Sequence, residues 1–147
     1  MNELDARRLR ILLIEDNPAD VELLKMALRH AQLDFDLTVI DDGADALALV
    51  GPRHDFADKT RPDLAIIDLN LPKYGGEEIL KALRANPALA QIPVAILSSS
   101  SAPRDRRGLQ SLRVGRYIVK PPDLDDFLQI GFTVKEFLIE SQSSGPA

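Results

Sequence analysis

The sequence predicts a doubly wound α/β domain, a three-layer sandwich in which helices cover both faces of a five-stranded parallel sheet. Short apolar runs alternate five times with segments whose apolar residues recur at helical spacing, a (βα)5 pattern. The runs at 10–14, 63–68 and 94–98 are almost continuously apolar, as in strands that are buried on both faces. Strands of this kind, each followed by a helix, favour a parallel sheet with right-handed crossovers.

The first half of the chain holds two expected strands and two expected helices. The strand at 10–14 leads into a helix at 18–31, which opens with a proline in its first turn. The segment 35–41 alternates apolar and polar residues, which is typical of a half-buried edge strand. A short helix follows at 43–50, and the polar, proline-containing segment 51–62 is expected to be a loop.

The second half of the chain continues the alternation. Its expected elements are a strand at 63–68, a helix at 76–86, a strand at 94–98, a weaker helix at 103–113, a strand at 117–120 and a long helix at 123–140. These elements belong to one domain at 9–140, preceded by an N-terminal arm at 1–8 and followed by a flexible tail at 141–147.

Composition and charge exclude several classes of function. Lys and Arg total 18 against 23 Asp and Glu, and the net charge of −5 disfavours a nucleic-acid partner. The chain has no cysteine, which excludes disulfides and thiolate metal sites and fits a cytoplasmic protein. No apolar run approaches the roughly 20 residues of a membrane span, so no membrane partner is expected.

Polar side chains stand at the ends of four predicted strands. Glu15 and Asp16 follow the first strand, Asp68 ends the third, Ser98 ends the fourth and Lys120 ends the fifth. Ligands of such sheets bind outside the carboxyl ends of the strands, where the strand order reverses. These side chains, although far apart in the sequence, are therefore expected to form one site.

The carboxylates of this group predict a magnesium site. Glu15, Asp16 and Asp68 would repel one another and retain protons if they converged without a cation. Mg²⁺ prefers oxygen ligands and uses few carboxylates, because it keeps several waters or phosphate oxygens. The backbone carbonyl of Asn70 is a further expected ligand.

An aspartate beside such a metal ion can attack phosphorus and form an aspartyl phosphate. Lys120 would supply a positive charge to the phosphoryl group and Ser98 a hydrogen-bond donor. Taken singly, each residue has an ordinary alternative, since acids and serines cap helices, aspartates occupy turns and lysines lie on surfaces. The right residue type at every one of these strand ends favours a common site.

These motifs together resemble the receiver domain of response regulators, the phosphoacceptor module of bacterial two-component signalling. LLIEDN is similar to the family's acidic pair, IIDLNLPKYGG to its phosphoacceptor turn, AILSSS to its hydroxyl strand and YIVKPP to its lysine strand. The match covers residues 8–140, and the spacings from Asp68 to Ser98 and to Lys120 agree with the family. The resemblance implies a flavodoxin-like fold with strand order 2-1-3-4-5.

The resemblance also implies a role for each matching residue. Asp68 would be phosphorylated, with Ser98 and Lys120 holding the phosphoryl group. Asp16 would bind Mg²⁺ directly and Glu15 mostly through water. Such a domain is a phosphoacceptor switch that catalyses only its own phosphorylation and dephosphorylation, and it turns over no external metabolite.

The resemblance further implies a switch and a partner. Ser98 and Tyr117 match the family's switch pair, in which Ser98 moves toward the phosphate and Tyr117 swings inward; Tyr117 can equally be an ordinary core aromatic. The partner would be a sensor histidine kinase. The NPAD motif, the long 51–62 loop and the lack of an output domain resemble single-domain regulators of bacterial phytochrome kinases.

Two alternatives stay open at this point. A pseudo-receiver would bind partners without being phosphorylated, although the complete set of site residues disfavours this. A phosphatase of the haloacid-dehalogenase type would need a second acid two residues after its nucleophile, where this chain has Asn70.

The expected final helix is unusually apolar around its circumference. At about 100° per residue, apolar positions of 123–140 span roughly 220°, whereas docking on one sheet needs nearer 100°. The surplus consists of Phe132 and Ile139 at one edge or Ile130 and Phe137 at the other. Exposed apolar surface of this kind predicts a homodimer through the helix. The alternative is that the N-terminal arm or the tail covers it.

Overall fold

The computed structural model describes residues 8–51, 61–71, 75–99 and 109–143. The strands are β1 (Leu9–Ile14), β2 (Phe35–Ile40), β3 (Leu64–Asp68), β4 (Val94–Ser98) and β5 (Arg116–Val119). The helices are α2 (Pro18–His30), α3 (Gly43–Val50), α4 (Gly76–Ala85), α6 (Leu124–Leu128) and α7 (Ile130–Ser143), with a 3-10 turn, η1, at Gln110–Leu112. The predicted alternation of strands and helices is confirmed wherever the chain is described.

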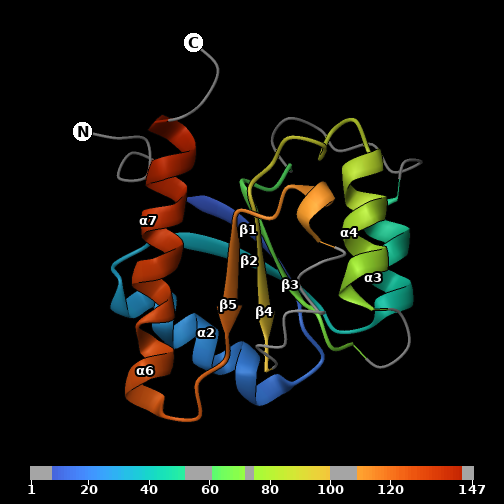
Figure 1. Cartoon of the computed structure of the whole chain (residues 1–147). Helices are drawn as coiled ribbons and strands as arrows, with labels where there is room; N and C mark the ends of the chain where they lie inside the picture. The colour runs from blue at the N-terminus through green and yellow to red at the C-terminus, as the bar shows by residue number, and fades with distance from the viewer. Residues whose placement is uncertain (1–7, 52–60, 72–74, 100–108, 144–147) are drawn as a thin grey trace.

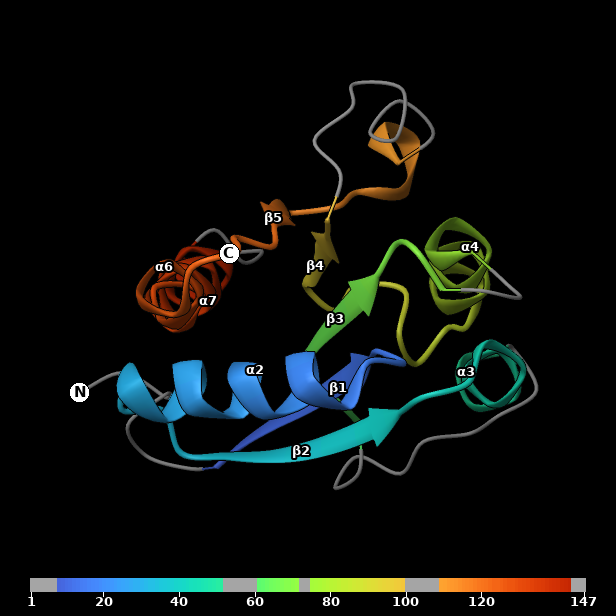
Figure 2. The ribbon, with the colours of Figure 1, turned by 90° about the horizontal axis from the view of Figure 1, so that it is seen from below.

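The sheet is fully parallel and has the order β2-β1-β3-β4-β5. Helices α2, α6 and α7 cover one face of the sheet, and α3 and α4 cover the other (Figures 1 and 2). This is the expected three-layer sandwich, and β2 is the predicted half-buried edge strand. Every helix in the described ranges is too short or too polar to cross a lipid bilayer.

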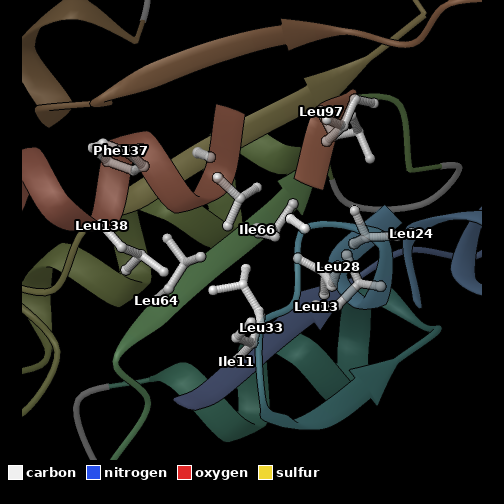
Figure 3. Packing of buried hydrophobic residues seen from close by; sticks show 14 of the residues in the cluster. Ile11, Leu13, Leu24, Leu28, Leu33, Leu64, Ile66, Leu97, Phe137 and Leu138 are labelled. Carbon is white, nitrogen blue, oxygen red and sulfur yellow. The ribbon is translucent and has the colours of Figure 1, made fainter. Parts of the chain in front are cut away.

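The core consists of two apolar clusters, one on each face of the sheet. Leu13, Ile66 and Leu97 project from neighbouring strands into the cluster under α2 and α7, to which Leu24 and Phe137 also belong (Figure 3). The alternate residues of the same strands enter the second cluster, under α3 and α4. Because β3 and β4 are buried along their whole length, each contributes to both clusters, which explains their continuous apolar sequences.

Helix α2 begins at the carboxyl edge of the sheet, and its start is fixed by a cap. The side chain of Asn17 accepts hydrogen bonds from the backbone N–H groups of Ala19 and Asp20, at 2.9 and 3.4 Å. Pro18 occupies the first turn, where a backbone N–H would have no partner within the helix. The cap places the acidic side chain of Asp20 over the strand ends.

The last part of the chain departs from the prediction of one helix at 123–140. The helix is interrupted at Gln129, between α6 and α7. The N–H of Gln129 donates to the Asp126 carbonyl at 3.2 Å and the N–H of Phe132 to the Gln129 carbonyl at 3.1 Å, both bonds of the tighter 3-10 type. Helix α7 then continues to Ser143, so the expected flexible tail is helical over 141–143.

The prediction that Ile130 and Phe137 are surplus apolar residues on the surface is wrong. They are only 5% and 6% exposed and belong to the core cluster under α2 and α7. The other edge is the exposed one, with Phe132 at 43% and Ile139 at 37%. The apolar arc is wide because the helix packs against more than the sheet.

Two glycines explain this wider packing of α7. A side chain on Gly131 would collide with the backbone of Ala27, so α7 lies directly against α2 at this point. A side chain on Gly115 would collide with the Phe137 ring, which therefore lies directly against the chain just before β5. The guanidinium of Arg116 stacks on the same ring, 5.3 Å from its centre.

The partly buried Arg84 of α4 ties this helix to two neighbouring segments. Its guanidinium donates to the carbonyls of Leu112, Ala90, Ile92 and Arg113 at 3.0, 3.0, 2.7 and 3.0 Å. Burial, together with the nearby positive charge of Arg113, lowers its pKa to about 10. Arg84 therefore holds η1 against the end of α4.

Three expectations fall wholly or largely outside the described residues. They are the N-terminal arm at 1–8, the loop at 51–62 and the weaker helix at 103–113, of which residues 109–113, with the η1 turn, are described.

Candidate functional site

The structure brings the predicted polar residues together at the carboxyl edge of the sheet, toward which the arrowheads of β4 and β5 point in Figure 1. Oxygens of Glu15, Asp16 and Asp68 all lie within 4.8 Å of one another. Lys120 Nζ is 3.2 Å from Asp68 Oδ2. Ser98 ends β4, the neighbour of β3, and is fully buried.

Lys120 is surrounded by carboxylates. Its Nζ lies 2.8 Å from Asp20 Oδ2, 2.9 Å from Glu15 Oε2 and 3.2 Å from Asp68 Oδ2. Only 13% of the Lys120 side chain is exposed, so these ion pairs are largely shielded from water. The ammonium is thus the positive counterpart of an acidic cluster.

The surroundings of this cluster shift two pKa values. Burial raises the pKa of Glu15 to about 7, and the neighbouring Asp68 carboxylate adds to this, while the hydrogen bond from Lys120 opposes it. Burial alone would lower the pKa of Lys120, but hydrogen bonds to Asp20 and Glu15 and the charge of Asp68 raise it. Lys120 is therefore positively charged at any physiological pH, and the carboxylates around it are not fully neutralised.

The donor set of this cluster fits a hard divalent cation such as Mg²⁺. Glu15 and Asp68 are buried, whereas Asp16 is exposed, so the carboxylates line a site that is open to solvent on one side. All donors are oxygens, and the open side leaves room for the waters or phosphate oxygens that Mg²⁺ retains. A bound cation would favour the charged form of Glu15 and so oppose burial and the Asp68 carboxylate, which raise its pKa.

Asn70 takes part in the site through groups that the sequence did not indicate. Its backbone N–H donates to Asp68 Oδ1 at 2.9 Å, and its side-chain amide donates to Ser98 Oγ at 3.0 Å and Ser99 Oγ at 3.3 Å. Asn70 therefore orients both the Asp68 carboxylate and the Ser98 hydroxyl. The expectation that its backbone carbonyl binds the metal remains a prediction.

Asp20 was missed because it lies within a helix rather than at a strand end. It follows Asp16 by one helical turn and belongs to the acidic first turn of α2, whose N-terminus faces the site. That spacing is the signal in the sequence that could have found it. Tyr117, the expected switch residue, is half-buried on β5 and packs on the cluster under α3 and α4.

Comparisons with known proteins agree with this geometry. The family described as Response regulator receiver domain matches residues 11–130. The response regulator Rcp1 of the cyanobacterium Synechocystis sp. is 34% identical over 131 residues, which cover 89% of this chain and 89% of that protein.

Two solved structures are similar over nearly their whole length. The phosphorylated cyanobacterial phytochrome response regulator RcpA is 35% identical with a TM-score of 0.79, covering 92% of this chain and 96% of that one. The Mn²⁺-bound form of Rcp1 is 33% identical with a TM-score of 0.75, covering 90% of this chain and 95% of that one. The similarity thus spans the whole sheet and both helical layers.

Proposed function

The chain belongs to the response regulator receiver domain family, and from this premise we propose that Asp68 accepts a phosphoryl group from a phosphohistidine of a sensor histidine kinase. The observation that carries the proposal is the set of contacts that the Asp68 carboxylate makes. One of its oxygens accepts the Asn70 N–H at 2.9 Å, and the other lies 3.2 Å from Lys120 Nζ. The carboxylate is therefore oriented beside a fixed positive charge and a site for a divalent cation.

In the proposed reaction a carboxylate oxygen of Asp68 attacks phosphorus. A P–O bond forms while the P–N bond to the kinase imidazole breaks, and the imidazole nitrogen keeps the electron pair of that bond. Asp68, Asp16 and Glu15 would hold Mg²⁺, which supplies positive charge for the phosphoryl oxygens. Lys120 contributes a further positive charge and Ser98 a hydroxyl, and the same residues assist the later hydrolysis of the aspartyl phosphate. The domain catalyses only these reactions of its own.

The phosphoryl group would arrive beside Ser98, whose hydroxyl now accepts a hydrogen bond from Asn70. A new anionic acceptor draws such a hydroxyl toward itself, which frees space behind it. We propose that Tyr117, half-buried on the adjacent strand, moves into that space. The charge change at Asp68 would then alter the surface around β5.

We propose a phytochrome-type histidine kinase as the partner, because the similar protein RcpA, which is 35% identical, is a phytochrome response regulator. A cytoplasmic location is part of the same proposal and agrees with the absence of cysteine from the sequence.

We also propose that the domain forms a homodimer through α7. Phe132 and Ile139 are exposed on this helix and are two turns apart, so they project from the same side. Sedimentation velocity of Phe132→Glu tests the proposal, with Leu124→Glu as a control, since Leu124 is equally exposed on α6. Loss of the dimer in the first variant alone is expected, and a dimer that persists in Phe132→Glu contradicts this interface.

Acetyl phosphate provides the direct test of the phosphoacceptor role. Wild type and Asp68→Asn would be incubated with this donor in the presence and absence of Mg²⁺ and analysed by intact mass spectrometry. Mg²⁺-dependent addition of one phosphoryl group to the wild type alone is expected. Absence of modification, both with acetyl phosphate and with a phosphorylated histidine kinase, would instead indicate a pseudo-receiver.

A further inference from the structure

The shortest contact of Lys120 is to Asp20 and not to the proposed phosphoacceptor. Lys120 Nζ lies 2.8 Å from Asp20 Oδ2 and 3.2 Å from Asp68 Oδ2. Asp20 comes from helix α2 and the lysine from the end of β5, so this ion pair links two elements across the site. Only 19% of the Asp20 side chain is exposed.

An ammonium group has three N–H donors, and here three carboxylates surround it, those of Asp20, Glu15 and Asp68. Glu15 and Asp68 also belong to the acidic cluster that fits a metal ion, whereas Asp20 lies outside that cluster. Metal binding and phosphorylation therefore change the charge on two of the three partners and leave Asp20 as it is. Asp20 is thus the partner of Lys120 that neither metal binding nor phosphorylation alters.

We propose that Asp20 is a positioning residue for phosphoryl transfer, which holds the Lys120 ammonium where it can contact a phosphoryl group on Asp68. A lysine side chain is long and flexible, and without a fixed partner it loses its alignment. A preorganised charge stabilises a transition state more than a mobile one does. This inference rests on the proposed function, because it assigns a role within the same reaction.

The simpler role of Asp20 is that of an acid in the first turn of a helix, where carboxylates stabilise the helix N-terminus. Asp45 occupies the corresponding first turn of α3 but is exposed to solvent. Asp45→Ala is therefore a matched control, since it removes the same charge from the same kind of position without touching Lys120.

The main test is a double-mutant cycle on phosphorylation by acetyl phosphate at saturating Mg²⁺. Asp20→Ala should lower the rate about tenfold, in the range of coupling expected for residues in direct contact. Asp20→Asn, which keeps a hydrogen-bond acceptor, should recover part of the loss, and Asp45→Ala should stay within about twofold of wild type. In the Lys120→Ala background, Asp20→Ala should have no further effect, because Asp20 acts through the lysine.

A second measurement, on metal-free protein, reports directly whether Asp20 keeps the Lys120 ammonium ordered. Ordered lysine ammonium groups give signals in proton–nitrogen NMR spectra that mobile ones lose to exchange, and the Lys120 signal is identified by its absence from Lys120→Ala. The signal should be present in wild type and Asp45→Ala and lost in Asp20→Ala.

Each outcome separates the two proposals. A rate for Asp20→Ala that equals or exceeds that of Asp45→Ala, or an undiminished effect of Asp20→Ala without Lys120, would overturn the positioning role. If wild type and Asp68→Asn both remain unmodified, with acetyl phosphate and with a phosphorylated histidine kinase, the phosphoacceptor function fails instead. In that case the NMR signal still decides whether Asp20 orders the lysine. Absence of the Lys120 signal from the wild-type spectrum would show that Asp20 does not hold the ammonium in place.

Discussion

Two partly buried cations of this domain, Lys120 and Arg84, have opposite surroundings. Lys120 stands among three carboxylates at the edge of the sheet. Arg84 donates to four backbone carbonyls, which link α4 to η1 and to the segment before β4. The pKa of Lys120 is raised, because its carboxylate partners outweigh the effect of burial, whereas burial and a like charge lower the pKa of Arg84 to about 10.

The difference indicates that Lys120 serves the function of the domain, whereas Arg84 stabilises its structure. Carboxylates around Lys120 carry net charge that a metal ion or a phosphoryl group can change, so its interactions are able to rearrange. Carbonyl groups carry no net charge that a metal ion or a phosphoryl group can change, so the interactions of Arg84 persist as long as the domain is folded. Substitutions at the two positions should therefore respond differently to Mg²⁺.

The largest effect is expected from Lys120→Met. This change leaves the buried carboxylates of Glu15 and Asp68 without their cation, and breaking a buried pair on one side costs about 4 kcal/mol of unfolding free energy. Saturating Mg²⁺ should restore most of this loss, because it supplies positive charge to the same carboxylates. Urea unfolding with and without Mg²⁺ measures both values. A loss that Mg²⁺ does not reduce would mean that Lys120 and the metal act on separate groups.

Arg84→Ala is expected to cost slightly less, about 3 kcal/mol, because it removes the guanidinium donor from the carbonyls of Ile92 and Leu112. The same urea experiment should give this loss equally with and without Mg²⁺. Phosphorylation by acetyl phosphate, measured where the variant is folded, should stay near the wild-type rate.

Arg84→Lys is the matched control for the Arg84 substitution. It keeps the charge but cannot reproduce the forked geometry of the guanidinium, so most of the loss in stability should remain. Full recovery by lysine would show that the charge of Arg84, rather than its directed hydrogen bonds, holds η1 in place.

The functional cation was predictable from the sequence, and the structural one was not. Lys120 ends a strand, and strand ends in a parallel sheet share one edge, so a linear pattern was sufficient to place it with Asp68. Arg84 stands on an ordinary amphipathic helix, and its partners are backbone carbonyls, which carry no sequence signal. Asp20 was missed for a related reason, since a polar residue in a first helical turn usually serves the helix alone.

The fold itself followed from apolar periodicity, but the final helix shows the limit of that method. The width of an apolar arc gives the amount of surface that needs cover, without saying which neighbour covers which edge. Ile130 and Phe137 are buried because α7 packs closely on α2, where Gly131 meets Ala27, and on Gly115 before β5. Only long-range packing, which periodicity does not contain, decides that Phe132 is the exposed residue.

The smallest expected effect concerns Asn17, the cap of the helix that carries Asp20. Asn17→Ala removes the acceptor for the Ala19 and Asp20 N–H groups and should lower the unfolding free energy by about 1 kcal/mol. Asp42→Ala, which removes the corresponding cap of α3, should have a similar cost in urea unfolding and serves as the control.

The two caps should differ in their effect on phosphorylation. A frayed first turn of α2 loosens Asp20 and with it Lys120, so Asn17→Ala should slow modification by acetyl phosphate, though less than Asp20→Ala does. The Asp42 cap supports a helix without contact to the lysine, and its loss should leave the rate unchanged. Equal rates in the two cap variants would show that the start of α2 stays ordered without its cap. The ion pair between Asp20 and Lys120 would then be sufficient by itself to hold both residues.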